Sequence, residues 1–312
     1  FFGAEGAPER TGRRRSALCG GEEIRLDFEA FVSEIEENGW DVHGIEVYER
    51  GKLTRRWGDT DGAVYDVFSV TKTVLSIAFG MACDREKISP DDLLMKYLPR
   101  EKKEKMSPAQ REAFGKITLR RLLTMSVGEL PFQAAGESYL DFALGCALQR
   151  PEEKTFNYSN VSAYLVGAAL TEALGEDVGT FIERNLFAPL GITKFSYERC
   201  PEEYFYGASR MKLTVNELSR IGMLLCNGGV YDGRRLLSEQ YVRTATSVQQ
   251  MNREGGYGYF IWKYRDGFSI TGKGGQRCYC LPEAGLMITY LSDMGENARA
   301  LRECMERTLL EG

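Results

Sequence analysis

The pattern of apolar and polar residues predicts strands toward both ends of the chain and helices between them. Apolar residues at positions 24, 28, 31, 32 and 35 predict a helix over 24–38. Alternating positions predict strands at 44–49 and 63–68, with Gly51 in the turn between them. Residues 71–83 are apolar on nearly all sides, which predicts a central helix that has little contact with solvent.

The rest of the chain predicts a helical lobe followed by a sheet. Residues 84–190 are expected to form helices and loops, and a further helix ends at Cys226. Four strands are expected after it, at 257–264, 268–271, 276–281 and 286–291. Their short turns favour an antiparallel meander, and the two early strands must join it because two strands alone are not stable. A last helix over 296–310 would pack on this sheet.

The predicted fold class is therefore α/β, of the α+β type. It consists of an antiparallel sheet flanked by helices, with an inserted all-helical domain. Residues 1–21 are Gly-rich, contain Arg13-Arg14-Arg15 and lack the apolar core of a signal peptide, so we expect a solvated tail. Residues 22–82 and 205–312 are expected to form the α/β domain from both chain ends. Residues 83–204 are expected to form the inserted helical domain.

Candidate chemistry begins at the start of the central helix. Ser69 and Lys72 are three residues apart, so on a helix their side chains are neighbours. A serine hydroxyl is a poor nucleophile until a base removes its proton, and a buried lysine with a lowered pKa can be that base. The spacing alone arises by chance in a chain of this length, so it needs further support.

Two later segments supply that support. Tyr158-Ser159-Asn160 places a phenol and an amide two residues apart, and both groups can act on protons or on a substrate carbonyl. Gly272-Lys273-Gly274-Gly275-Gln276 follows a strand-like run, where glycines often mark a close approach of the backbone to a ligand.

The order S-x-x-K, Y-x-N and K-x-G resembles the serine beta-lactamase and penicillin-binding-protein superfamily. The Y-x-N form is similar to class C enzymes and their esterase, amidase and aminohexanoate-oligomer hydrolase relatives. Further segments resemble landmarks of the family in the family's order, namely residues 91–99, 117–126, 186–192 and 228–238. The resemblance covers about residues 22 to 295.

The resemblance implies a role for each of these residues. Ser69 would attack a carbonyl to form an acyl-enzyme, and Lys72 would accept the serine proton. Tyr158 would carry protons to the leaving group and help to activate water. Asn160 would orient the substrate amide or Lys72. The backbone N–H groups of Ser69 and Gln276, the latter just past Gly275, would form the oxyanion hole.

Lys273 could hold a substrate carboxylate, or its charge could help Lys72 and Tyr158 to lose their protons. The K-T-G element reads Lys273-Gly274-Gly275 and lacks the Thr hydroxyl that commonly binds a beta-lactam carboxylate, so beta-lactam specificity is in doubt. An esterase or amidase, a peptidase acting on D-amino-acid peptides, and a relative that binds ligands without turnover all stay open.

The composition of the chain narrows the classes of substrate and the kinds of hydrolase mechanism. The chain has 312 residues and a net charge of −5, so a small-molecule amide, ester or peptide substrate fits better than nucleic acid or an anionic membrane. No apolar run is long enough to span a bilayer. His43 is the only histidine and no G-x-S-x-G is present, so Lys and Tyr must replace the His of a Ser-His-Asp hydrolase.

The eight cysteines have no C-x-x-C spacing and there is only one histidine, so no zinc site is expected. No cofactor is expected either. Most should be buried thiols, which favours a reducing compartment and a cytoplasmic location, although a signal peptide upstream of Phe1 could have been removed.

Overall fold

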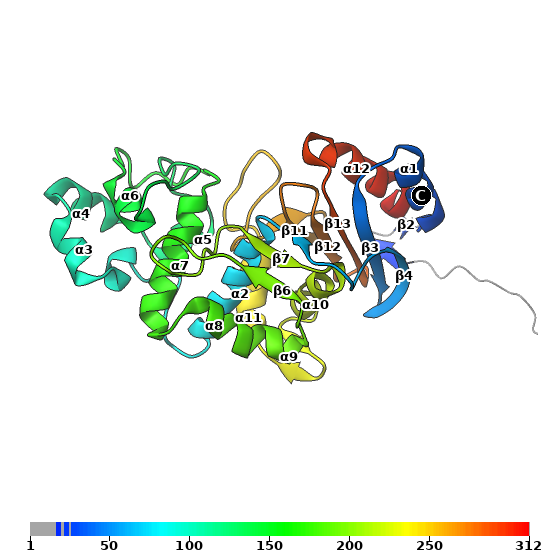
Figure 1. Cartoon of the computed structure of the whole chain (residues 1–312), viewed down its shortest axis with the longest axis horizontal. Helices are drawn as coiled ribbons and strands as arrows, with labels where there is room; N and C mark the ends of the chain where they lie inside the picture. Colours follow the sequence, from blue (N-terminus) through cyan, green and yellow to red (C-terminus); the bar gives the residue numbers. More distant parts are fainter. Residues whose placement is uncertain (1–16, 20–21, 25, 312) are drawn as a thin grey trace, which may run out of the picture.

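The computed structural model describes residues 17–19, 22–24 and 26–311 of the chain, and Figure 1 shows their arrangement. The first two elements are short strands, β1 (Ala17–Cys19) and β2 (Glu22–Ile24), which pair antiparallel. Most of the tail predicted over 1–21 lies outside the described residues.

A six-stranded antiparallel sheet forms the centre of one end of the molecule, in the order β10-β11-β12-β13-β3-β4. Its strands are β3 (Val42–Glu49), β4 (Lys52–Gly58), β10 (Trp262–Tyr264), β11 (Gly267–Thr271), β12 (Arg277–Leu281) and β13 (Leu286–Ser292). The first two strands join the later four through β13 and β3, so both ends of the chain build one sheet, as predicted.

Helices cover both faces of this sheet. The helices α1 (Phe28–Glu37) and α12 (Ala298–Met305), which continues as a π-helical turn over Glu306–Leu310, share a core with one face. The helix α10 (Val215–Cys226) packs against the other face, on β12 and β13. Successive side chains of β12 point to opposite faces of the sheet. Cys278 and Cys280 therefore pack in the core on the α10 face, and Tyr279 packs in the core on the face covered by α1 and α12.

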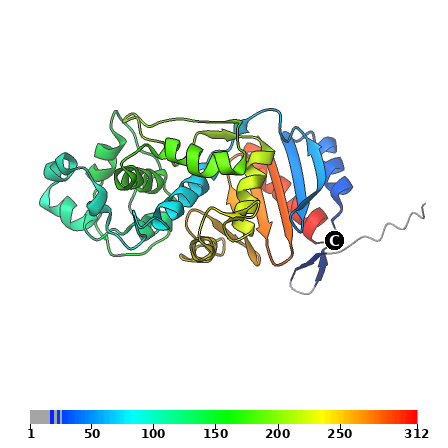
Figure 2. The same ribbon diagram turned by 90° about the horizontal axis from the view of Figure 1, so that it is seen from below.

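The central helix is α2 (Val70–Cys83), and its side chains from Val70 to Ala82 are all buried, as its apolar pattern predicts. It contacts α7 and links the sheet end of the molecule to the helical end. Figures 1 and 2 show the two ends side by side along the long axis. The helices between them in sequence are α3 (Arg100–Lys105), α4 (Pro108–Phe114), α5 (Leu119–Leu123), α6 (Tyr139–Gly145), α7 (Asn160–Leu174), α8 (Val178–Ile182) and α9 (Ala188–Leu190). Domain boundaries at residues 83 and 204 remain our proposal.

Small elements complete the chain. A three-stranded sheet of β5 (Tyr65–Asp66), β7 (Met211–Leu213) and β6 (Phe195–Tyr197) lies beside the central helix. The hairpin of β8 (Val230–Tyr231) and β9 (Arg234–Arg235) and the helix α11 (Glu239–Thr246) follow α10.

Two predicted strands differ from the structure. The partner of β3 is β4, not residues 63–68, of which only Tyr65–Asp66 is a strand, in the small sheet. The prediction was wrong because β4 is an edge strand with mostly exposed side chains, so it lacks apolar alternation. The strand expected over 257–264 is limited to Trp262–Tyr264.

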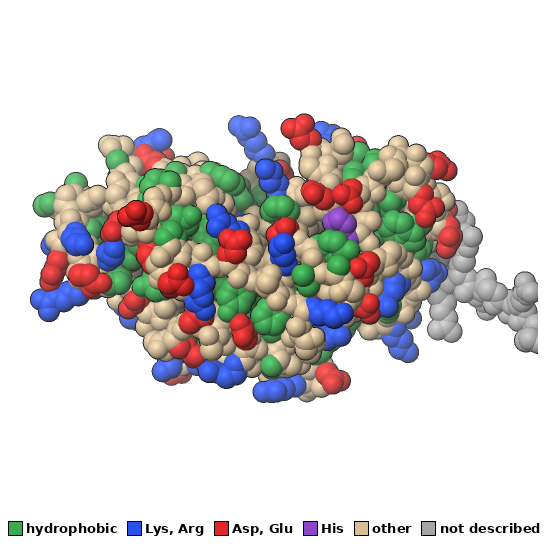
Figure 3. All heavy atoms as spheres, in the orientation of Figure 1, with side chains coloured by type: hydrophobic (Ala, Val, Ile, Leu, Met, Phe, Trp, Pro, Cys, Tyr) green, Lys and Arg blue, Asp and Glu red, His purple; other side chains and the backbone are tan. Residues whose placement is uncertain are grey.

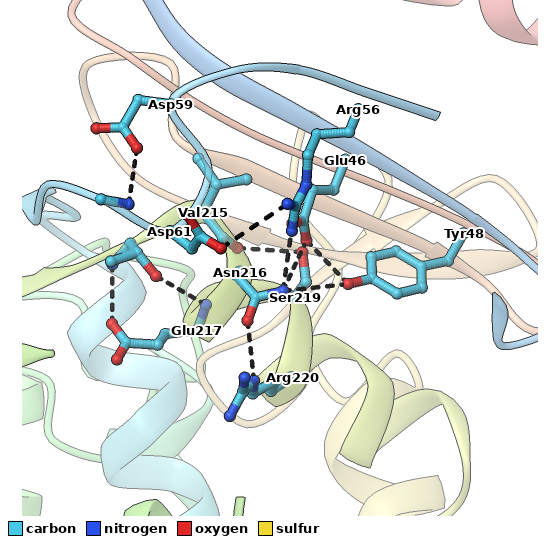
Figure 4. A network of polar contacts seen from close by, with 12 residues as sticks. Glu46, Tyr48, Arg56, Asp59, Asp61, Val215, Asn216, Glu217, Ser219 and Arg220 are labelled. Carbon is cyan, nitrogen blue, oxygen red and sulfur yellow. Dashed lines mark hydrogen bonds and ion pairs between the residues drawn. The ribbon is translucent and has the colours of Figure 1, made fainter. Parts of the chain in front are cut away.

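A polar network connects β3 and β4 to α10 (Figure 4). The carboxylate of Glu46 has no solvent exposure and accepts hydrogen bonds from Arg56 Nη2 and Tyr48 Oη, each at 2.9 Å. Asn216 Nδ2 on α10 donates to the same carboxylate at 3.2 Å. A buried charge needs such partners, and here they fix the position of α10 on the sheet.

The exposed face shown in Figure 3 carries acidic and basic side chains interspersed. Among the described residues, none of the helices combines the length and the apolar character that crossing a membrane requires.

Candidate active site

Ser69 lies at a sharp turn that leads into α2. Phe68 before it has a φ of +47°, a conformation that side chains rarely adopt, and Ser69 is the N-cap residue of the helix. Ser69 lines a cavity of about 1100 Å³. The turn between β11 and β12 packs against this segment: a Cβ added to Gly272 would lie 2.5 Å from the carbonyl oxygen of Val67.

Lys72 points from α2 to the serine. Its Nζ lies 3.1 Å from Ser69 Oγ, 2.6 Å from Asn160 Oδ1 and 2.6 Å from the carbonyl oxygen of Ala208. The side chain is only 1% exposed, and none of these three acceptors carries a charge. Because burial disfavours the ammonium form, the pKa of Lys72 is lowered to about 7.

A neutral amine has two N–H donors and one lone pair. The oxygen atoms of Asn160 and Ala208 can each accept one N–H, which leaves the lone pair directed at Ser69 Oγ. The arrangement therefore suits removal of the proton from the serine hydroxyl.

The orientation of Asn160 is set by its own amide contacts. Asn160 Nδ2 donates to Gln133 Oε1 at 2.7 Å, and Gln133 Nε2 donates to Tyr206 Oη at 2.8 Å. In this arrangement the amide presents its oxygen to Lys72. Of the two roles expected for Asn160, this geometry matches the orientation of Lys72.

Tyr158 forms an aromatic wall of the cavity. Its ring stacks on Trp262 with centroids 5.8 Å apart, and Lys72 Nζ lies 5.0 Å from the ring centroid of Tyr158. Burial raises the pKa of Tyr158 to about 12, against the opposing effects of hydrogen bonding to Ser69 and Tyr257 and of the charge on Arg277. At neutral pH the phenol keeps its proton and can donate it.

The backbone N–H groups of Ser69 and Gln276 are the two expected to form the oxyanion hole. Neither the N–H of Ser69 nor that of Gln276 donates to another protein atom within the described residues. Arg277 Nη1 holds the strand end in place, because it donates to the carbonyl oxygens of Gly272 at 2.7 Å and Gln276 at 2.9 Å.

The side chain of Gln276 faces away from the cavity. It donates to the carbonyl of Ser292 at 2.6 Å and accepts from the N–H of Gly274 at 2.8 Å. Gly275 has a φ of +98°, and a Cβ there would lie 2.4 Å from Ser292 Oγ, so the backbone requires glycine. Lys273 is exposed and lines the same cavity as Ser69.

Comparison with known proteins identifies the family of this chain. The sequence model of the beta-lactamase family, described as Beta-lactamase, matches residues 32–309. The chain belongs to the beta-lactamase family.

Solved structures agree with this beta-lactamase family assignment at the level of fold. A protein of Bacillus anthracis assigned as a 6-aminohexanoate-dimer hydrolase is 18% identical, with a TM-score of 0.73 over 94% of this chain and 83% of that chain. A penicillin-binding protein homolog from Caulobacter crescentus is 16% identical, with a TM-score of 0.71 over 90% of this chain and 96% of that chain. A beta-lactamase from Mycobacterium bovis is 20% identical, with a TM-score of 0.63 over 89% and 99%. No curated protein sequence matches.

In this member of the beta-lactamase family, Ser69, Lys72, Tyr158 and Asn160 come together, and Lys273 lines the same cavity. Gly275 and Gln276 follow Lys273 in the chain but are not among the residues that line the cavity. Sequence reasoning missed the carbonyl of Ala208, Gln133 and Arg277. A backbone acceptor leaves no mark in a sequence, and neither Gln133 nor Arg277 belongs to a recognisable motif. Trp262 also lines the cavity.

Within the described residues seven cysteines are free, of which four are buried and three, Cys83, Cys146 and Cys226, are partly buried. Cys278 and Cys280 lie side by side with their sulfur atoms 3.7 Å apart. Within the described ranges, no group of three or more His, Cys, Asp or Glu side chains is arranged to hold a metal ion.

Proposed function

We propose that this protein is a serine hydrolase that cleaves an amide or ester bond through an acyl-enzyme on Ser69. The observation that carries the proposal is the buried amine of Lys72, which lies 3.1 Å from the serine hydroxyl and is surrounded by uncharged acceptors. A lysine whose pKa is about 7 is half deprotonated near neutral pH, which suits a general base.

In the first half of the reaction, Ser69 Oγ attacks the substrate carbonyl carbon while Lys72 takes the hydroxyl proton. The carbonyl oxygen becomes negatively charged, and the N–H groups of Ser69 and Gln276 would stabilise it. Removal of one such donor typically costs about 10²- to 10³-fold in rate. The bond to the leaving group breaks as Tyr158 donates its proton to that group and regains one from Lys72.

In the second half, water attacks the acyl carbon. Lys72 or Tyr158 takes the water proton, and Ser69 regains its own proton when the acid is released. Tyr158 lies next to Lys72, and Ser69 affects the pKa of its phenol, so we propose that a proton passes among the three side chains.

The substrate is proposed only as an amide, ester or peptide. Gly274 stands where a K-T-G element has Thr, and a Cβ added there would lie 2.7 Å from Gln276 Nε2, so the Gln276 amide would have to move. This geometry supports the esterase or amidase alternative over a beta-lactamase.

Intact-protein mass after exposure to a fluorophosphonate tests the proposal, with Ser69→Ala as the control. We expect one covalent adduct on the wild-type protein and none on the variant. A parallel incubation with a penicillin separates the substrate classes, because a persistent penicilloyl mass would favour a peptidase acting on D-amino-acid peptides. If the folded wild-type protein gave no adduct with either reagent, the hydrolase mechanism would fail and a ligand-binding function would replace it.

A further inference from the structure

Two aromatic rings pack against the ring of Tyr158. The ring of Tyr257 meets it edge to face, with centroids 6.2 Å apart and an interplanar angle of 82°. Trp262 stacks on it from another side, and the rings of Tyr257 and Trp262 contact each other with centroids 4.7 Å apart. Phe156 contacts both of these rings. Packing of this kind fixes where the ring of Tyr158 lies.

Both rings come from one tight hairpin, in which Tyr257 and Trp262 are paired antiparallel. The backbone of this hairpin is tied to two helices at Phe260. The N–H of Phe260 donates to the carbonyl oxygen of Leu123 on α5 at 3.0 Å, and its carbonyl oxygen accepts a hydrogen bond from Thr73 Oγ1 on α2 at 3.0 Å. The hairpin therefore holds the two rings at a fixed place relative to the central helix.

The hydroxyl of Tyr257 is not needed for this packing. Tyr257 is 1% exposed and is not among the residues that line the cavity, so its side chain does not meet a substrate there. Phenylalanine would supply the same ring, and a buried hydroxyl lowers the stability of a fold unless it has a partner. In the described part of the chain, the phenol of Tyr158 is the group whose charge and hydrogen bonding act on the pKa of Tyr257.

The two phenols differ in how easily they lose a proton. Burial raises the pKa of Tyr257 well above its ordinary value and Tyr158 raises it further, whereas Tyr257 lowers the pKa of Tyr158, which is about 12. Tyr257 therefore keeps its proton when Tyr158 gives its own away, and it can donate to the oxygen that remains. The charges near Tyr158 lie on other elements: Lys72 Nζ on α2 is 5.0 Å from the ring centroid, and Arg277 on β12 lowers the pKa of the phenol.

We propose that Tyr257 is a positioning residue of the reaction: its buried hydroxyl donates to the phenol oxygen of Tyr158 and keeps that phenol aligned for proton transfer to the leaving group. The inference rests on the proposed function, since Tyr257 acts only through the proton donor of that mechanism. When the O–H bond of Tyr158 breaks and the leaving group takes the proton, the hydrogen bond from Tyr257 stabilises the phenoxide until Lys72 returns a proton to it. Tyr257 keeps its own proton throughout.

Two acetate esters that differ only in the leaving group test the inference. Ethoxide needs a proton to depart from ethyl acetate, whereas 4-nitrophenoxide departs from 4-nitrophenyl acetate without one. Both esters give the same acetyl-enzyme, and kcat/KM reports only the steps up to its formation. We expect Tyr257→Phe to lower kcat/KM for ethyl acetate by about five- to tenfold, the size of one hydrogen bond, and to leave that for 4-nitrophenyl acetate nearly unchanged.

Tyr290→Phe is the matched control, because Tyr290 is also a buried tyrosine whose hydroxyl interacts with a second tyrosine, Tyr279, but it does not line the cavity. It should change neither rate constant. In a Tyr158→Phe background, Tyr257→Phe should cause no further loss with ethyl acetate, because the residue it acts through is already disabled. Equal losses with both esters, a fully additive loss in the double variant, or wild-type rates in Tyr257→Phe would overturn the inference.

Titration of the phenol separates the two proposals, because it needs no turnover. With 3,5-difluorotyrosine in place of Tyr158, the fluorine atoms make the phenol more acidic and report its charge by fluorine NMR. Adding Tyr257→Phe should raise the midpoint by about one to two pH units, since the phenoxide loses a donor, and Tyr290→Phe should not move it. If no ester is hydrolysed but the midpoint rises in this way, the hydrolase proposal fails and the hydrogen bond between the two phenols stands. If the midpoint stays the same, the role of Tyr257 is wrong.

Discussion

Glu46 and Lys72 are both buried ionisable side chains, but they lie in opposite surroundings. Glu46, between the sheet and α10, faces a guanidinium, a phenol and an amide that all donate to it (Figure 4). Lys72, on α2, faces only uncharged groups. A buried charge with a counter-ion serves to hold elements together, whereas a buried lysine without one loses its proton easily. We therefore interpret Glu46 as a structural side chain and Lys72 as a reactive one.

The largest expected effect comes from removal of the amine. Lys72→Met should lower the rate at which a fluorophosphonate modifies Ser69 by about 10³-fold, because no other described base contacts the hydroxyl. Measured rate constants for wild type, Lys72→Met and Lys116→Met, an exposed lysine in the helical region, check this. A loss of less than tenfold in Lys72→Met would contradict the role of Lys72 as base.

The same variant should be more stable than wild type at low pH. The pKa of Lys72 is about 7 in the folded chain, below its ordinary value of 10.5. Below pH 7 Lys72 is charged in both the folded and the unfolded chain. Burial of that charge lowers the stability of the folded chain by about 3–5 kcal/mol, at 1.36 kcal/mol per unit of pKa difference. Between pH 7 and 10.5 the unfolded state binds more protons, so wild-type stability rises with pH.

Urea unfolding of both proteins from pH 6 to pH 10 measures this difference. The advantage of Lys72→Met should shrink steadily across that range. An advantage that is independent of pH would show that methionine merely packs better.

Tyr158→Phe should reduce kcat by about 10²-fold, because it keeps the stacking on Trp262 and removes only the hydroxyl that handles protons. Turnover of an ester with an alkoxide leaving group, which needs a proton to depart, measures the effect, with unfolding free energy as the check on folding. Equal kcat in the variant would remove Tyr158 from the mechanism.

Glu46→Gln should have the smallest effect: it should lower the free energy of unfolding by about 1–2 kcal/mol. The N–H₂ of Gln could donate only to Tyr48 Oη, and the negative charge that balances Arg56 would be lost. The solvent exposure of Arg56 reduces the loss. Urea unfolding should show it, while the modification rate of Ser69 stays unchanged. A slower Ser69 reaction in this variant would couple the two regions and break the contrast.

Local patterns predicted part of this picture. The all-apolar run predicts α2 and the burial of Lys72, and the spacing of three residues predicts the contact with Ser69, because both depend only on helix geometry. The contact with Asn160 spans 88 positions, and only the family resemblance brought it forward.

Other features depend on tertiary structure. The acceptor from Ala208 is a backbone atom 136 positions from Lys72, so no side-chain pattern marks it. The strand β4 is exposed along most of its length and has no apolar alternation to reveal it.

The pH dependence of Ser69 modification by a fluorophosphonate tests the central claim most directly. If Lys72 is the base with a pKa of about 7, the second-order rate constant should rise about tenfold per pH unit below pH 7 and become constant above it. A rate that is still rising at pH 10 would mean that Lys72 keeps its ordinary pKa, and a rate that is flat from pH 5 to pH 10 would mean that it is not the base.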